Sequence, residues 1–73
     1  MMNQRQIMYD ALVAHANGQI AKHKANVNIY LNQSIGIGEH SDIIETLEKE
    51  INKIGHYEEQ LSVLEKHFKD NTL

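Results

Sequence analysis

The chain has no cysteine, no proline and no tryptophan among its 73 residues. Without cysteine, disulfides and thiolate metal sites are excluded, and a reducing compartment is favoured. Without proline, long uninterrupted helices are favoured, because proline removes a backbone donor and clashes inside a helix. A chain this short buries a small fraction of its surface. We therefore expect a single domain, residues 1–73, that depends on a partner subunit for stability.

Charge and hydropathy exclude two further classes of partner. The formal net charge is −3 with histidine neutral, which argues against nucleic acid as the main partner, since phosphate binding requires clustered Lys and Arg. No apolar run approaches the ~18 residues of a membrane span. The N-terminal stretch MMNQRQIMYDALV has no long apolar segment, so no signal peptide is expected. These features predict a cytoplasmic protein that does not bind membranes.

Apolar residues in the first part of the chain recur at helical spacing, in steps of four and three. This pattern predicts a helix over residues 4–33 with a heptad row that packs against another helix. We assign this row to an oligomer interface. Its members are Tyr9, Val13, Ala16, Ile20, His23, Val27 and Tyr30.

A second row of small residues follows the opposite side of the same predicted helix, between Ile7 and Ile29. Small residues let two helix backbones approach closely, although alanine also favours helices on exposed faces. One partner helix in the same chain cannot cover two opposite rows, so the pattern indicates a homo-oligomer, either a dimer or a tetramer. The row consists of Ala11, Ala14, Gly18, Ala21 and Ala25.

The spacing of apolar residues in the second half of the chain predicts a second helix, over residues 42–69. Its apolar row contains two consecutive steps of three around Gly55, which indicates local overwinding or a bend. We expect this row to form the helix–helix core. Its members are Ile44, Leu47, Ile51, Ile54, Tyr57, Leu61, Leu64 and Phe68.

Two glycines mark the predicted connecting loop, residues 34–41. Gly36 suits a left-handed helix end and Gly38 adds turning freedom, while Ser41 or Asp42 suits the cap of the next helix. The Gly36-x-Gly38 pair resembles part of a dinucleotide-binding motif. That motif requires a preceding strand and a third glycine, where this chain has a helix and Ser41. The loop is therefore interpreted as a turn, and no cofactor is expected.

Five histidines occur, at positions 15, 23, 40, 56 and 67, and no two have the i,i+3 or i,i+4 spacing of metal ligands on one helix face. His23 lies on the apolar row, where a polar residue can fix register. We expect it to bond a tyrosine or an acid on the facing helix. The alternatives are a pH switch or a metal ligand across a symmetric interface, and His40 in the loop is a second metal candidate.

No nucleophile stands beside a base in the sequence, and neither predicted helix has a Glu-x-x-His motif, so an enzyme is not expected. Two helices of about thirty residues joined by a short loop run antiparallel. One such hairpin buries a single row of side chains. The predicted fold is an all-α antiparallel two-helix hairpin that assembles into a four-helix bundle or larger homo-oligomer.

Three stretches carry a resemblance to a known group of proteins. They are HANG…KHK…NIYL from His15, IGIGEHSDIIE from Ile35, and I…Y…L.VLEKHF from Ile54 to Phe68. Nearly the whole chain resembles small uncharacterised helical proteins of tailed, myovirus-type marine bacteriophages, including those of cyanobacteria. The GIGEH segment is the most specific part.

This resemblance implies a setting, the cytoplasm of an infected host cell, and no activity. Small acidic helical phage proteins commonly act by binding, as assembly or virion components or as modulators of a host or phage protein. Two alternatives stay open: a small nucleic-acid-binding helical-hairpin dimer, and a metal-binding helical bundle through His23.

Overall fold

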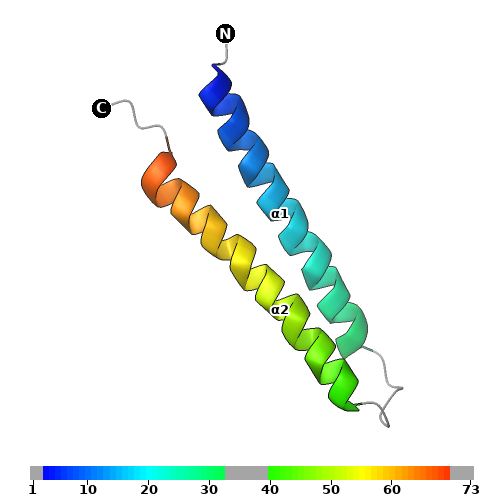
Figure 1. Cartoon of the computed structure of the whole chain (residues 1–73). Helices are drawn as coiled ribbons and strands as arrows, with labels where there is room; N and C mark the ends of the chain where they lie inside the picture. Colours follow the sequence, from blue (N-terminus) through cyan, green and yellow to red (C-terminus); the bar gives the residue numbers. More distant parts are fainter. Residues whose placement is uncertain (1–2, 33–39, 70–73) are drawn as a thin grey trace.

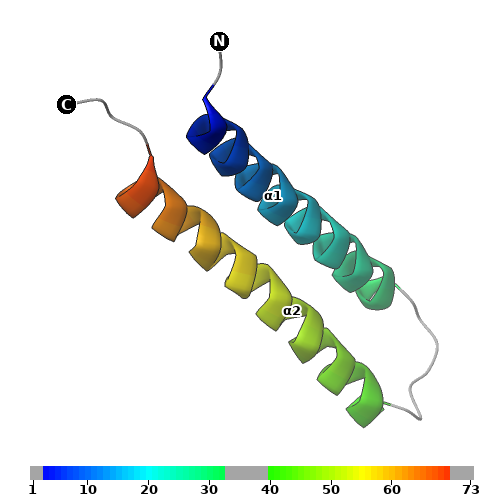
Figure 2. The same cartoon turned by 45° about the horizontal axis from the view of Figure 1, so that its top comes forward.

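The computed structural model describes residues 3–32 and 40–69 of the chain. Helix α1 spans Gln4–Leu31 and helix α2 spans His40–Val63, and a π-helical turn, η2, continues α2 over Leu64–Phe68. The two helices lie side by side and antiparallel, with both chain termini at one end (Figures 1 and 2). No strand occurs in the described ranges, which confirms the predicted all-α class.

Asparagine side chains close both ends of α1. The Asn3 side chain accepts a hydrogen bond from the backbone N–H of Gln6 at 2.7 Å. At the other end, Asn32 Nδ2 donates to the carbonyl of Asn28, also at 2.7 Å. The first bond satisfies a backbone N–H that the helix start leaves without an internal partner. The second adds a side-chain donor to a carbonyl that also accepts the backbone N–H of Asn32.

Helix α2 begins earlier than the sequence predicts. It starts at His40, so Ser41 and Asp42 lie in its first turn and do not precede it as caps. An acid inside the first turn benefits from the positive helix N-terminus just as a capping acid does. Residue type alone therefore could not tell whether Asp42 precedes the helix as its N-cap or lies in its first turn. The predicted turn residues Gly36 and Gly38 lie outside the described residues.

The predicted row on α1 is buried or half-buried from Tyr9 to Val27, where α1 packs against α2, whereas its last member, Tyr30, is exposed. Ala16 is fully buried at 0% exposure and His23 is 8% exposed, and no other described residue is classed as buried. The remaining core contacts are half-buried on both helices. On α2 they recur in steps of four and three, at Ile43, Leu47, Glu50, Ile54, Tyr57, Leu61 and Leu64.

Two predicted core residues of α2 lie elsewhere. Ile44 and Ile51 are 55% and 54% exposed, and Ile43 and Glu50 take their places facing α1. The regular spacing therefore continues past Gly55 without the predicted slip. The sequence prediction followed apolar residues and passed over Glu50, whose charge is accepted at this position because a polar partner faces it. Phe68, the last predicted core residue, is half exposed.

The row of small residues lies on the outer side of α1, away from α2. All five of its members are exposed, as are the flanking Ile7 and Ile29. A Cβ added at Gly18 would meet nothing within 4 Å in the single chain. Helix α1 thus has one apolar row against α2 and a second that the described residues leave uncovered.

Replacing Ala16 by leucine is expected to destabilise the helix pair by about 1–3 kcal/mol, because the larger side chain overpacks a fully buried position. Asn17→Leu introduces the same side chain at an exposed neighbouring position and is the control. Urea denaturation at low protein concentration measures both. Equal free energies of unfolding for the two variants would contradict the observed packing.

Gly55→Ala is expected to stabilise the protein by about 1 kcal/mol, because alanine has the higher helix propensity. The added Cβ would meet nothing within 4 Å. The midpoint of thermal unfolding measures the change. A lower midpoint would mean that another backbone passes close to Gly55 in the assembled protein.

Candidate functional site

A polar cluster interrupts the apolar contact near the middle of the helix pair. His23 Nδ1 of α1 lies 2.6 Å from Glu50 Oε1 of α2. Asn26 Nδ2, also on α1, donates to the same carboxylate oxygen at 2.9 Å. The side chains of His23 and Glu50 are 10% and 19% exposed, so water competes little for these bonds. The cluster joins the two helices by hydrogen bonds from both residues of α1.

The cluster holds Glu50 in its ionised form. The hydrogen bond from His23 lowers the pKa of the Glu50 carboxyl below its ordinary value of 4.5, and the bond from Asn26 lowers it further. Partial burial opposes this effect, and the positive charge of Lys22 adds to it. Because an ionised carboxylate only accepts hydrogen bonds, His23 donates from Nδ1.

The polar pair constrains how the helices align. Sliding one helix past the other would leave a histidine and a carboxylate against apolar side chains, which costs free energy. His23 thus bonds an acid on the facing helix, one of the two partners expected from sequence. Glu50 itself was missed. The sequence signal that could have found it is the regular four–three spacing from Ile43 through Leu47, Ile54 and Tyr57, which places Glu50 on the same row.

His15 and His56 are exposed and both lie against the same tyrosine. His15 and His56 contact the ring of Tyr57 edge to face, with centroid separations of 5.7 and 4.8 Å. Gln60 Nε2 lies 3.2 Å from His56 Nε2. Within residues 3–32 and 40–69, no three His, Cys, Asp or Glu side chains form a group that could hold a metal ion. The side chain of His40, the second metal candidate, lies outside the described part.

A shallow apolar trough runs between the helices near the chain termini. It consists of two adjoining cavities of about 360 and 320 Å³ that share Leu12 and Leu64. We call this surface the terminal trough. The first cavity is lined by Arg5, Met8, Tyr9, Leu12, Leu64 and Phe68. The second is lined by Leu12, His56, Glu59, Gln60, Val63 and Leu64.

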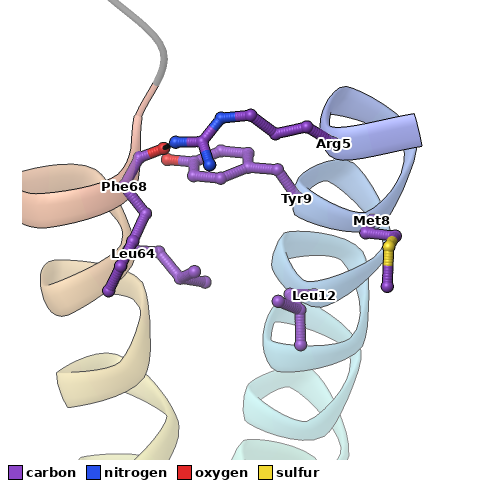
Figure 3. Close-up of a pocket in the computed structure, with 6 residues that line it drawn as sticks. All are labelled: Arg5, Met8, Tyr9, Leu12, Leu64 and Phe68. Atoms are coloured by element: carbon purple, nitrogen blue, oxygen red, sulfur yellow. Dashed lines mark hydrogen bonds between the residues drawn. The ribbon is translucent and has the colours of Figure 1, made fainter. Parts of the chain in front are cut away.

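Arg5 crosses one end of the terminal trough. Its side chain extends from α1, and its Nη2 donates to the carbonyl of Phe68 at 2.6 Å, so the guanidinium lies on the α2 side (Figure 3). Tyr9 extends in the same direction, and Leu64 points from η2 into the space between the helices (Figure 3). Turns of π-helix are rare and occur frequently at functional sites. Here the turn carries two of the apolar lining residues.

No protein-family model, curated protein or solved structure matches the chain. Among the described residues, neither helix is both long and apolar enough to span a bilayer.

The protein is expected to lose stability as the pH falls below 4.5, because the pKa of Glu50 is lower in the folded protein than in the unfolded chain. The unfolded chain then binds the proton more readily, which favours unfolding. Between pH 5 and 3, the free energy of unfolding of Glu50→Gln should therefore fall less steeply with decreasing pH than that of the wild type.

The control for this measurement is Glu48→Gln, which removes an exposed carboxylate from the same helix. Urea denaturation across the pH range gives the slopes. Identical slopes for wild type and Glu50→Gln would contradict the stabilising role of the ionised cluster.

Proposed function

We propose that the chain is a non-enzymatic helical hairpin that acts through homo-oligomerisation and protein–protein interaction. One observation carries this proposal: the described residues bury only Ala16 and His23, while ten large hydrophobic side chains remain exposed. The exposed side chains are Ile7, Met8, Leu12, Ile29, Tyr30, Leu31, Ile44, Ile51, Val63 and Phe68.

The imbalance supports assembly on energetic grounds. Ordering a residue costs about 1–2 kcal/mol of backbone entropy, and burial returns about 25 cal/mol for each Å² of apolar surface. A helix pair without any fully buried large side chain recovers little of that cost by itself. Two hairpins packed as a four-helix bundle bury a second set of side chains, which is the usual solution for small helical proteins.

The outer row of α1 supplies one candidate interface. Its small members would let a helix of another copy approach closely, and the exposed Ile7 and Ile29 at its ends would be covered by that contact. Close approach of this kind is what a row of Ala and Gly permits. In the proposed assembly this row joins hairpins to one another, giving a dimer or tetramer.

The resemblance to phage proteins supports the proposed setting. In it, the oligomer works in the cytoplasm of an infected bacterium, as an assembly component or as a modulator of a host or phage protein. The exposed apolar side chains that oligomerisation leaves uncovered would form the surface for that second protein.

The expected result in solution is a mass of at least twice the chain mass of 8.4 kDa. Light scattering on a size-exclusion column, across a dilution series, measures the mass. The melting temperature should rise with protein concentration, because subunit association stabilises the folded state. A monomer with a concentration-independent melt would overturn the proposal.

Gly18→Leu tests the outer row. In the single chain the added side chain enters open space and raises helix propensity, so the isolated hairpin should not be weakened. A smaller oligomer, with helix content retained, is therefore expected if another copy packs there. Asn17→Leu, an exposed neighbour off the row, is the matched control and should leave the mass unchanged. An unchanged mass for Gly18→Leu would remove the outer row from the interface.

A further inference from the structure

The terminal trough has opposite charges at its two ends. Arg5 lines the cavity nearer the termini, and Glu59 lines the other cavity. Arg5 lies level with Phe68, to whose carbonyl it donates. Glu59 lies nine residues before Phe68, which corresponds to about 14 Å along the helix axis. Leu12, Val63 and Leu64 line the trough between the two charges, with the polar His56 and Gln60 beside Glu59.

Both charges lie on the same side of the trough. Glu59 belongs to α2, and the side chain of Arg5 crosses from α1 so that its guanidinium lies beside the α2 end (Figure 3). The midpoint between the two levels falls at Val63 and Leu64, in the apolar part of the trough. A two-fold axis that crosses the helices at this midpoint therefore exchanges the positions of the positive and negative ends.

We propose that the terminal trough pairs with the terminal trough of a second copy, antiparallel, about this two-fold axis. Arg5 of each copy then faces Glu59 of the other, and the apolar side chains around Leu64 and Leu12 cover each other. In such a symmetric contact every pair occurs twice, so a patch must complement itself. The inference rests on the proposed homo-oligomerisation and adds the surface, the direction and the pairing residues.

A second copy fits this surface better than a different partner of one charge. A basic partner would be repelled at Arg5, and an acidic one at Glu59, whereas a second copy in this orientation matches both ends. The contact would also cover Leu12 and Phe68, each 51% exposed in the single chain. Charge pairs at the rim of such a contact chiefly set orientation and partner choice, and apolar burial supplies most of the affinity.

Charge reversal tests the pairing. Glu59→Arg leaves the Arg5–Phe68 hydrogen bond in place and creates two repulsive contacts per dimer. It should weaken dimerisation by about tenfold at low ionic strength, and less at high salt, as expected for exposed charges. The double variant Arg5→Ala/Glu59→Arg removes the cation that the new arginine would face, so it should dimerise more tightly than Glu59→Arg alone. Sedimentation equilibrium gives the dissociation constants.

Glu58→Arg is the matched control, because it makes the same change at the adjacent exposed position, which does not line the trough. It should leave the dissociation constant within about twofold of wild type, the precision expected of the measurement. An unaffected Glu59→Arg variant would overturn the inference. So would a double variant no tighter than the single one, with helix content checked by circular dichroism.

The absence of cysteine allows a direct test of the axis. Val63→Cys places the only thiol of the chain near the proposed two-fold axis. Under mild oxidation two copies should cross-link rapidly, because a disulfide requires Cα atoms about 4.4–6.8 Å apart. Asn52→Cys, exposed and remote from the trough, should cross-link slowly. Equal rates for the two variants would contradict the proposed axis.

These outcomes separate the inference from the proposed function. Suppose that Glu59→Arg does not change the dissociation constant but Gly18→Leu makes the oligomer smaller. The proposed function would then hold, and only the pairing of terminal troughs would be overturned. A wild-type chain that stays monomeric would overturn both.

Discussion

Two helices share one line of contact, and the rest of the structure depends on that constraint. Along the line, Ala16 and His23 are the buried residues of the described ranges, and the flanking contacts are half-buried. A third layer of structure would be needed to cover the outer sides of the helices. Because the described chain supplies none, large apolar side chains remain exposed on both helices, and the proposed self-association would cover them.

The His23–Glu50 contact gives this narrow interface a preferred alignment. Apolar rows with regular four–three spacing tolerate sliding by one heptad, since each shifted position again meets an apolar residue. A hydrogen-bonded histidine and carboxylate do not tolerate it, because each would be left without its partner in an apolar environment. The contacts of Arg5 with Phe68 and of His15 with Tyr57, on one side of the cluster, follow the same alignment. A polar pair at this position contributes less stability than apolar packing would, but it favours one register of the two helices.

The terminal trough follows from the same register. Aligning His23 with Glu50 brings the first turns of α1 level with η2, so Leu12 and Leu64 line the same cavities and Arg5 donates to the carbonyl of Phe68. The oppositely charged ends of the trough therefore have a defined spacing. In the proposed dimer, that spacing is what makes the surface complementary to itself. The proposed pairing between chains therefore depends on the register of the two helices within each chain.

The sequence by itself determined the all-α class, the approximate helix ranges and the row of α1 that faces another helix, because helical periodicity and the absence of proline are local properties. It also indicated that His23 would need a polar partner. Only the tertiary structure decided that this partner is Glu50, that Ile43 replaces Ile44 in the contact, and that Ile51 is exposed. The prediction from spacing considered apolar residues alone. A carboxylate can lie in the helix contact only where a hydrogen-bond donor faces it, and that depends on the residue of the other helix. The trough was likewise hidden from sequence, because its lining comes from both helices and exists only once they are aligned.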